Sequence, residues 1–243
     1  MNIRLDIEYD GSLYAGWQVQ NNAVSVQSEI EKALATVFRK PIRITGAGRT
    51  DTGVHAAGQV ANFQVTELPV PLETLRRSLN GLLKEGIAIK AVREVPDDFH
   101  ARYSARLRTY IYSISKVKRA IDRHKYFFLS YELDMKKVRQ AARKLLGVHD
   151  FRYFSIATGE KSTICDIKKL EIHDTDDEIQ ITLCANRFLH KMVRMIVGLL
   201  IDIGRGKVEL SYIDEVLSGK KVKRKKGFAA PAHGLCLVRV DYE

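Results

Sequence analysis

The chain has 243 residues, 45% of them hydrophobic, and a formal net charge of +11, so it can bury a core and is expected to attract a polyanion such as nucleic acid. No apolar run approaches the ~18 residues of a membrane-spanning helix and no secretory signal is expected, which argues against a membrane partner. The three cysteines lack paired spacing, which argues against a disulfide framework or a zinc site and favours a cytoplasmic location.

The first half of the chain predicts the element order β-α-β-β-α-β. Residues 3–9 alternate apolar and polar side chains, as a strand does. Apolar residues at helical spacing over 26–38, after Ser25 as N-cap, predict a helix that Pro41 stops. The other elements expected in this half are a short strand at 42–44, a strand at 59–65, a helix from Pro71 to Leu82 and a strand at 87–95.

The second half predicts a similar order. Its expected elements are a strand at 107–115, a helix at 135–145 ended by Gly147, strands at 166–173 and 178–185, a long helix at 188–204, a shorter helix at 210–217 and a last strand at 235–242. Two such units indicate an α+β fold of two ferredoxin-like halves, 1–105 and 106–243, with a mixed, mostly antiparallel sheet. If the terminal strands pair across the halves, one continuous sheet floors a central cleft.

Residues 46–63 contain the most informative stretch, in which one carboxylate, Asp51, stands in a loop with four glycines between two apolar runs. Arg49 and His55 flank it closely. An Asp in such a loop is often an Asx-turn or a helix cap. The triplet Asp51-Thr52-Gly53 also occurs in aspartic proteases, but here the second carboxylate would have to come from a homodimer. Because four glycines around one acid exceed what a turn needs, we interpret the loop as a site.

The predicted strand at 107–115 places Arg108, Tyr110 and Tyr112 on one face. This pattern is typical of cross-strand aromatic packing and equally of a platform on which a nucleobase stacks. Basic clusters at 116–125 and 220–226 favour the second interpretation, because they also attract RNA.

The predicted helix at 188–204 carries a polar stripe of Arg187, Lys191 and Arg194, which Gly198 continues. Such a stripe is commonly a solvated basic face. Alternatively, Arg194 lies among apolar neighbours and holds a carboxylate bidentately, while Gly198 lets another backbone approach.

Several segments together resemble the tRNA pseudouridine synthase A (TruA) family. The segments that carry the resemblance are Gly-Arg-Thr-Asp-Thr-Gly-Val-His-Ala at 48–56, Phe-His-Ala-Arg at 99–102, Tyr110, the pattern Asn186-x-Phe188-Leu189-x-x-Met192-Val193-Arg194-x-Ile196-Val197-Gly198, and Ala232-x-Gly234-Leu235. They follow one another in order along almost the whole chain.

The resemblance implies a homodimeric isomerase without cofactor or metal, which converts uridine to pseudouridine at positions 38, 39 and 40 of the tRNA anticodon stem-loop. It implies that Asp51 is the nucleophile, Tyr110 stacks on the base and Arg194 is the partner of Asp51. It further implies substrate-binding roles for Arg49, which would displace the target base or hold the RNA open, for His55, and for Leu235 as a wall of the pocket.

The residues themselves leave two questions open. A carboxylate can form a covalent intermediate or remove a sugar proton to give a glycal. Net charge and aromatic side chains alone are also compatible with a non-catalytic RNA-binding protein or chaperone.

Overall fold

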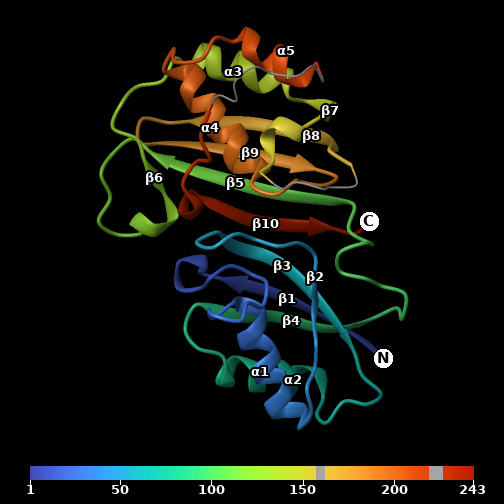
Figure 1. The fold of residues 1–243 in the computed structure, drawn as a ribbon. Helices are drawn as coiled ribbons and strands as arrows, with labels where there is room; N and C mark the ends of the chain where they lie inside the picture. Colours follow the sequence, from blue (N-terminus) through green and yellow to red (C-terminus); the bar gives the residue numbers. More distant parts are fainter. Residues whose placement is uncertain (157–161, 219–226) are drawn as a thin grey trace. The chain divides into compact units, whose positions relative to one another are not determined.

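The computed structural model of the chain describes residues 1–156, 162–218 and 227–243. The chain forms two compact units: unit 1 is Met1–Arg106 with Cys236–Glu243, and unit 2 is Leu107–Leu235. Each unit combines helices with mostly antiparallel strands, which confirms the predicted α+β fold class (Figure 1). The units differ from the predicted halves, 1–105 and 106–243, in the last strand, most of which is counted with unit 1. The basic cluster at 220–226 lies outside the described residues.

Unit 1 has the predicted order β-α-β-β-α-β, followed by the end of the chain. Its elements are β1 (Asn2–Tyr9), the 3-10 helix η1 (Gly11–Leu13), α1 (Val26–Phe38), β2 (Thr45–Gly46), β3 (His55–Gln64), α2 (Leu72–Leu82), β4 (Ile87–Val95) and β10 (Leu235–Asp241). The strand order is β4-β1-β3-β10, and β2 also pairs with β3. Strand β1 is antiparallel to both its neighbours, whereas β10 is parallel to β3, with Cys236 opposite His55.

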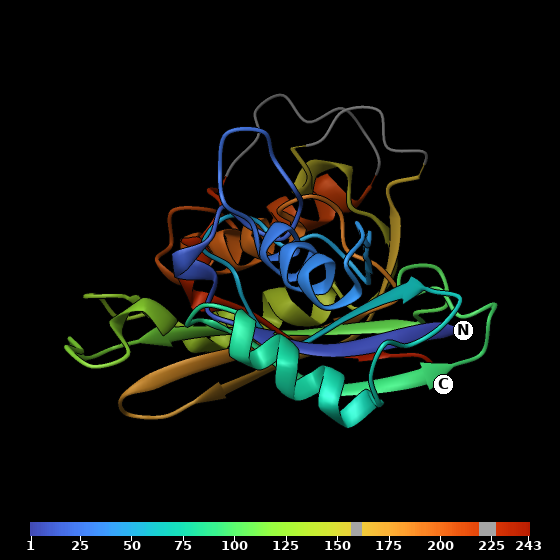
Figure 2. The ribbon, with the colours of Figure 1, turned by 90° about the horizontal axis from the view of Figure 1, so that it is seen from below.

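The core of unit 1 comes from the apolar periodicities of its strands and helices. Ile3, Leu5 and Ile7 alternate along β1 and are fully buried, as are Ile30 of α1 and Leu75 of α2. Helices α1 and α2 pack against each other (Figure 1). Both chain termini belong to unit 1 and lie at the same side of it (Figures 1 and 2).

Helix α1 begins where the sequence predicts. The Ser25 hydroxyl accepts a hydrogen bond from the Ser28 backbone N–H (3.2 Å), and Ser28 Oγ accepts one from the Ser25 N–H (3.1 Å). This reciprocal pair satisfies two backbone donors that the first turn of a helix leaves unpaired. The helix ends at Arg39, whose φ of +54° is left-handed.

Unit 2 combines mostly antiparallel strands with three α-helices and three 3-10 helices among its described residues. Its elements are β5 (Leu107–Ser115), η2 (Arg123–Lys125), β6 (Phe127–Phe128), α3 (Met135–Lys144), β7 (Gly147–Asp150), η3 (Arg152–Phe154), β8 (Ile164–Asp174), β9 (Glu178–Ala185), α4 (Met192–Gly204), α5 (Ser211–Leu217) and η4 (Ala232–Gly234). The strand order is β5-β9-β8-β7, and the short β6 pairs in parallel with β5. Strands β8 and β9 form a long hairpin (Figure 2), and α3 packs against α4.

Three predicted elements begin three or more residues away from their expected positions. The strand expected at 42–44 lies at Thr45–Gly46, and the strand expected at 59–65 begins at His55. The helix expected from residue 188 begins at Met192, because Lys191 adopts a left-handed φ of +62°. The predicted stripe of Arg187, Lys191 and Arg194 is therefore wrong, since only Arg194 is on the helix.

In the three described ranges, no helix combines the length and the apolar character needed to cross a lipid bilayer.

Candidate active site

Asp51 stands in the loop between β2 and β3 of unit 1. The residue is half-buried, Arg49 is exposed and Thr50 is buried. The backbone carbonyl of Asp51 accepts a hydrogen bond from the Val54 N–H (3.1 Å), and Gly53 between them has a φ of +81°. The Asp51 side chain is therefore carried by a closed turn whose shape depends on a glycine.

Buried hydrogen bonds fix the loop on either side of this turn. The Tyr9 hydroxyl on β1 lies 2.7 Å from Thr50 Oγ1, and both residues are buried. The Gln59 amide on β3 donates to the Gly48 carbonyl (3.0 Å). Because unmade hydrogen bonds are costly in a buried site, these contacts hold the residues next to Asp51 in one position.

The segment between β1 and α1 packs beneath the loop. The Trp17 N–H donates to the Thr50 carbonyl (3.1 Å). A Cβ added to Gly16, whose φ is +83°, would lie only 2.7 Å from the Thr50 carbonyl oxygen and 3.1 Å from the Asp51 carbonyl carbon. The sequence does not by itself predict these supports, although a lone tryptophan beside a glycine in a polar loop indicates close packing.

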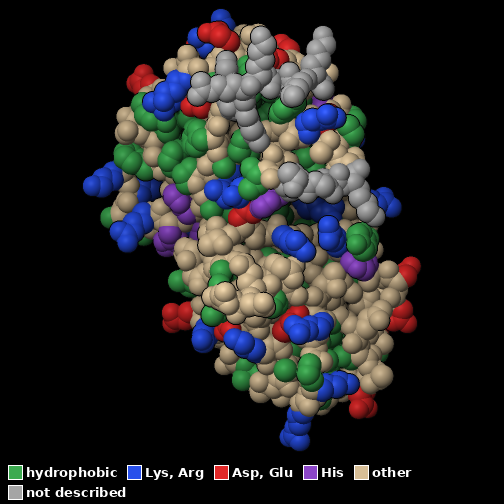
Figure 3. All heavy atoms as spheres, in the orientation of Figure 1, with side chains coloured by type: hydrophobic (Ala, Val, Ile, Leu, Met, Phe, Trp, Pro, Cys, Tyr) green, Lys and Arg blue, Asp and Glu red, His purple; other side chains and the backbone are tan. Residues whose placement is uncertain are grey.

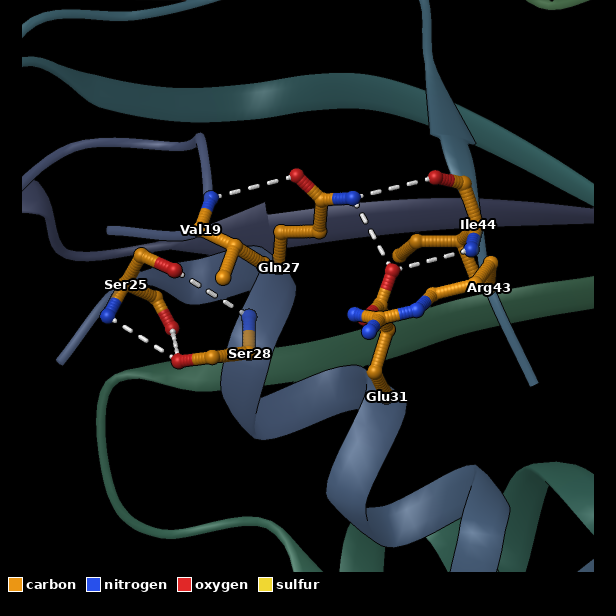
Figure 4. Close-up of polar contacts among 7 residues, drawn as sticks. All are labelled: Val19, Ser25, Gln27, Ser28, Glu31, Arg43 and Ile44. Atoms are coloured by element: carbon orange, nitrogen blue, oxygen red, sulfur yellow. Dashed lines mark hydrogen bonds and ion pairs between the residues drawn. The ribbon is translucent and has the colours of Figure 1, made fainter. Parts of the chain in front are cut away.

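Polar side chains of α1 hold the chain that enters the loop (Figure 4). Glu31, which is buried on the helix, accepts hydrogen bonds from Gln27 (2.9 Å) and from the Ile44 N–H (3.1 Å), and forms an ion pair with Arg43 (2.6 Å). Gln27 also donates to the Ile44 carbonyl (3.1 Å) and accepts from the Val19 N–H (3.3 Å). Helix α1 thereby joins the segment below the loop to the segment leading into it.

His55, predicted as a substrate-binding residue, is buried at the start of β3. Its Nδ1 lies within hydrogen-bond distance of the Gly11 N–H (3.2 Å) and of Asp10 Oδ1 (3.1 Å). These contacts attach the end of the Asp51 loop to η1.

Tyr110, on β5 of unit 2, is 9% exposed. The Phe188 ring meets it edge to face, with centroids 5.2 Å apart and planes at 89°. This geometry is favourable for aromatic pairs and fixes the orientation of the Tyr110 ring. Phe188 lies in a segment that the apolar pattern predicts as helix, so its contact with Tyr110 is not predictable from the sequence.

Arg194 lies in the first turn of α4 and is half-buried. Its Nε donates to the Ala230 carbonyl (2.7 Å), and its own carbonyl accepts from the Ala230 N–H (3.0 Å). One turn further along, a Cβ added to Gly198 would lie 1.8 Å from the Phe228 carbonyl oxygen. The prediction that Gly198 lets another backbone approach is confirmed, and that backbone orients Arg194.

Leu235, predicted as a pocket wall, is buried directly after η4. A Cβ on the preceding Gly234 would lie 2.8 Å from the Tyr112 ring, and the Tyr112 hydroxyl donates to the Pro231 carbonyl (2.8 Å). Burial raises the pKa of Tyr112 above its usual range, although nearby Arg194 acts in the opposite direction. Tyr112 is therefore a neutral donor at working pH.

The predicted site residues fall into two groups, one in each unit. Arg49, Asp51 and His55 lie together on the loop of unit 1, and Tyr110, Arg194 and Leu235 belong to unit 2. Within the described part of the chain, no group of three or more His, Cys, Asp or Glu side chains could hold a metal ion.

Comparison with known proteins identifies the class of enzyme that this fold and loop define. A family model described as tRNA pseudouridine synthase matches residues 7–104 and 141–243, which is most of the chain. The chain belongs to this family and is an isomerase. Family membership therefore decides against the non-catalytic RNA-binding protein.

Three similar proteins, each named tRNA pseudouridine synthase A, match this chain over almost its whole length. The protein from Exiguobacterium sp. is 40% identical over 242 residues, covering 99% of this chain and 98% of the relative. The protein from Ruminiclostridium cellulolyticum is 42% identical over 244 residues, with 99% of each chain covered. The protein from Leptospira biflexa is 41% identical over 250 residues, covering 100% of this chain and 94% of the relative.

Among solved structures, a chain of a Cbf5–Nop10–Gar1 complex matches with a TM-score of 0.33 and 7% identity. The match covers 82% of this chain and 54% of that one. A likeness of this degree supports no structural or functional conclusion.

Proposed function

We propose that the protein isomerises uridine to pseudouridine at positions 38, 39 and 40 of the tRNA anticodon stem-loop, with Asp51 as the nucleophile. The observation that carries the proposal is the half-buried Asp51, held in its loop by the 2.7 Å contact between Tyr9 and Thr50. A carboxylate in a fixed position can attack the sugar or remove a proton from it without first being ordered.

The reaction requires that the bond between N1 of the base and C1′ of the sugar breaks, that the base rotates, and that C5 bonds to C1′, with C5 losing its proton and N1 gaining one. The target nucleotide must first leave the helical stack, which costs a few kcal/mol that contacts in the pocket offset. In our proposal Tyr110 stacks on the detached base, so that it rotates rather than escapes. Arg194 binds and orients the Asp51 carboxylate, while Arg49, His55 and Leu235 bind the substrate around it.

The distribution of charge supports tRNA as the partner. Lys and Arg side chains exceed Asp and Glu by 11 in the whole chain, and basic side chains are exposed on both units in the view of Figure 3. Such a surface raises the local concentration of a polyanion. We propose that the enzyme acts as a homodimer in the cytoplasm. Sedimentation of the purified protein tests the dimer, for which we expect the mass of two chains.

Site-resolved mapping of pseudouridine tests the choice of positions. tRNA transcripts that carry uridine only at 38, only at 39 or only at 40 of the anticodon arm are incubated with the enzyme, and pseudouridine is located by mass spectrometry. We expect modification at each of the three positions. Modification confined to uridines outside the anticodon arm would overturn the assignment of the substrate site.

Replacing Arg194 by lysine tests its proposed role. Lysine keeps the charge but lacks the planar fork that binds a carboxylate through two parallel hydrogen bonds. We expect Arg194→Lys to lower kcat at least tenfold with little change in tRNA affinity. Turnover equal to that of the wild type would exclude a bidentate partner role.

A further inference from the structure

Tyr103, in the turn between β4 and β5, is unusually exposed for an aromatic residue. The residue is 77% exposed, more than any other aromatic residue among those the structure describes as exposed. The His100 ring lies beside it, with centroids 4.3 Å apart and planes tilted by 34°, and Arg102 Cζ lies 5.7 Å from the ring centroid. Tyr103 therefore stays largely open to solvent although His100 and Arg102 lie close to its ring.

The backbone of this turn is fixed locally by His100. Its Nδ1 accepts hydrogen bonds from the N–H groups of Arg102 and Tyr103, both at 3.2 Å. Its own N–H donates to Ser104 Oγ (3.0 Å), and its carbonyl accepts from the Ser104 N–H (2.9 Å). The imidazole that stacks on Tyr103 therefore also orders the residues carrying it.

Polar side chains, two of them buried, anchor the same turn to the strands of unit 1. Asn2 of β1 donates to the Phe99 carbonyl (2.7 Å), and Asn62 of β3 accepts from the Ala101 N–H (2.9 Å). The Tyr242 hydroxyl, just after β10, donates to the Ala101 carbonyl (2.8 Å). Three separate parts of unit 1 thus hold a turn whose aromatic side chain faces solvent.

A preordered exposed aromatic ring is suited to binding, because little side-chain freedom is lost when a partner arrives. Residues 99–106 contain His100, Arg102 and Arg106 and no acidic residue, although Asp97 and Asp98 directly precede them, and Arg102 beside the ring supplies a positive charge for an anion. A nucleotide combines a flat base for the ring with a phosphate for the arginine.

We propose that Tyr103 is a stacking platform for an unpaired base of the tRNA substrate, and that Arg102 binds an adjoining phosphate. This inference rests on the proposed function and adds a second base-contacting residue, on unit 1, to the Tyr110 of the reaction itself.

Matched substitutions separate stacking from charge. The variants are Tyr103→Ala, Tyr103→Leu, Tyr103→Phe and Arg102→Gln. Tyr131→Ala is the control, because Tyr131 is also exposed (37%) and its ring centroid lies 3.8 Å from the Cζ of an arginine, Arg205. For each variant we would measure the Kd for a tRNA transcript at several salt concentrations, pseudouridine formation at saturating tRNA, and thermal unfolding.

Loss of one stacked base weakens binding by about 5- to 150-fold. We expect that loss for Tyr103→Ala and Tyr103→Leu, with an unchanged salt dependence, unchanged kcat and unchanged melting, because an exposed side chain contributes little to stability. Tyr103→Phe and Tyr131→Ala should bind within about twofold of wild type, because neither removes the proposed platform. Arg102→Gln should reduce the slope of log K against log salt by roughly 0.7–0.9, the value for one phosphate.

Wild-type affinity in both Tyr103→Ala and Tyr103→Leu, with an active wild-type enzyme, would overturn the proposal. An equal loss in Tyr103→Phe would also contradict stacking, because phenylalanine keeps the ring. Failure of the proposed function is distinguishable: the wild type itself would then form no pseudouridine, and the platform would have no substrate.

Discussion

The position of Asp51 depends on residues for which we propose no role in the reaction. Thr50 precedes it, is buried, and accepts or donates the 2.7 Å hydrogen bond of Tyr9. Gly16 lies so close that any side chain there would collide with the Thr50 carbonyl. The position of the proposed nucleophile is therefore fixed mainly by the segments 9–17 and 44–60.

Substituting Thr50 tests this support. Thr50→Val keeps the shape but leaves the buried Tyr9 hydroxyl without its 2.7 Å partner, which should cost about 1–3 kcal/mol of unfolding free energy. We expect kcat to fall at least several-fold at saturating tRNA while KM changes little. Thr50→Ser retains the hydroxyl and should restore kcat.

Chemical denaturation and single-turnover kinetics measure the two effects separately. If Thr50→Val and Thr50→Ser had the same kcat, the hydroxyl would have no part in positioning Asp51.

At the residue scale, the sequence alone suggests Asp51 as the candidate nucleophile but does not predict the residues that support its loop. Four glycines around one acid are a local signal within a single segment of the chain. Tyr9 and Trp17 lie more than 30 residues away from Thr50, and nothing in their own neighbourhood shows that β1 and the following segment pack beneath the loop.

Among the elements, α4 and the segment 227–231 act together to orient Arg194. The segment binds Arg194 through Ala230 and touches the helix at Gly198. Close backbone contact of this kind has no room for a side chain, so one glycine controls the placement of an arginine four residues earlier.

Gly198→Ala and Gly81→Ala form a matched pair of helix substitutions. At Gly198 the new methyl would lie 1.8 Å from the Phe228 carbonyl oxygen, and overpacking of this kind typically costs about 1–3 kcal/mol. At Gly81 of α2 a Cβ meets nothing within 4 Å, so alanine should stabilise by about 0.5–1 kcal/mol.

Urea unfolding of both variants gives the free energies, and pseudouridine formation gives the activities. We expect Gly198→Ala to lose activity as well, because Ala230 moves with the segment. Gly198→Ala with wild-type stability would refute the close contact.

Tyr112 on β5 predicts a dependence of stability on pH. Burial raises its pKa above the usual 10.0, so above pH 10 the unfolded chain loses a proton that the folded chain keeps. This contribution to stability is complete below pH 10 and is lost as pH rises further. Tyr112→Phe removes it and also leaves the Pro231 carbonyl without its donor, at a cost of about 1–3 kcal/mol.

Unfolding free energies at pH 8 and pH 11 check the sign. The gap between wild type and Tyr112→Phe should be larger at pH 8 and should narrow at pH 11. A gap that widens with pH would contradict a buried neutral tyrosine.

The end of a helix or strand is predictable from the sequence when the residues that fix it are close together in the chain. Helix α1 starts where Ser25 predicts, because a capping box lies within four residues. Helix α4 does not start where its apolar pattern does, because Asn186 is held by distant partners and Lys191 cannot continue a helix backwards with its left-handed φ. Asn186 bonds to Asp166 on β8 and its carbonyl accepts from Arg108 on β5, and Lys191 turns left-handed.

For the whole molecule, the class of fold and the family follow from the sequence, whereas the pairing of distant strands does not. The order of elements along unit 1 is enough to indicate a ferredoxin-like arrangement, because each element has its own apolar period. The parallel pairing of β10 with β3 brings together residues about 180 positions apart, and no local sequence pattern predicts it.

The most direct test of the central claim is tritium release from tRNA transcripts labelled at C5 of uridine, with wild-type enzyme and Asp51→Asn. Isomerisation replaces the C5–H bond by the new glycosidic bond, so the label is released only when pseudouridine forms. We predict release by the wild type and none by Asp51→Asn, with the same Kd for tRNA. Release by Asp51→Asn at the wild-type rate would contradict the assignment of Asp51 as the nucleophile.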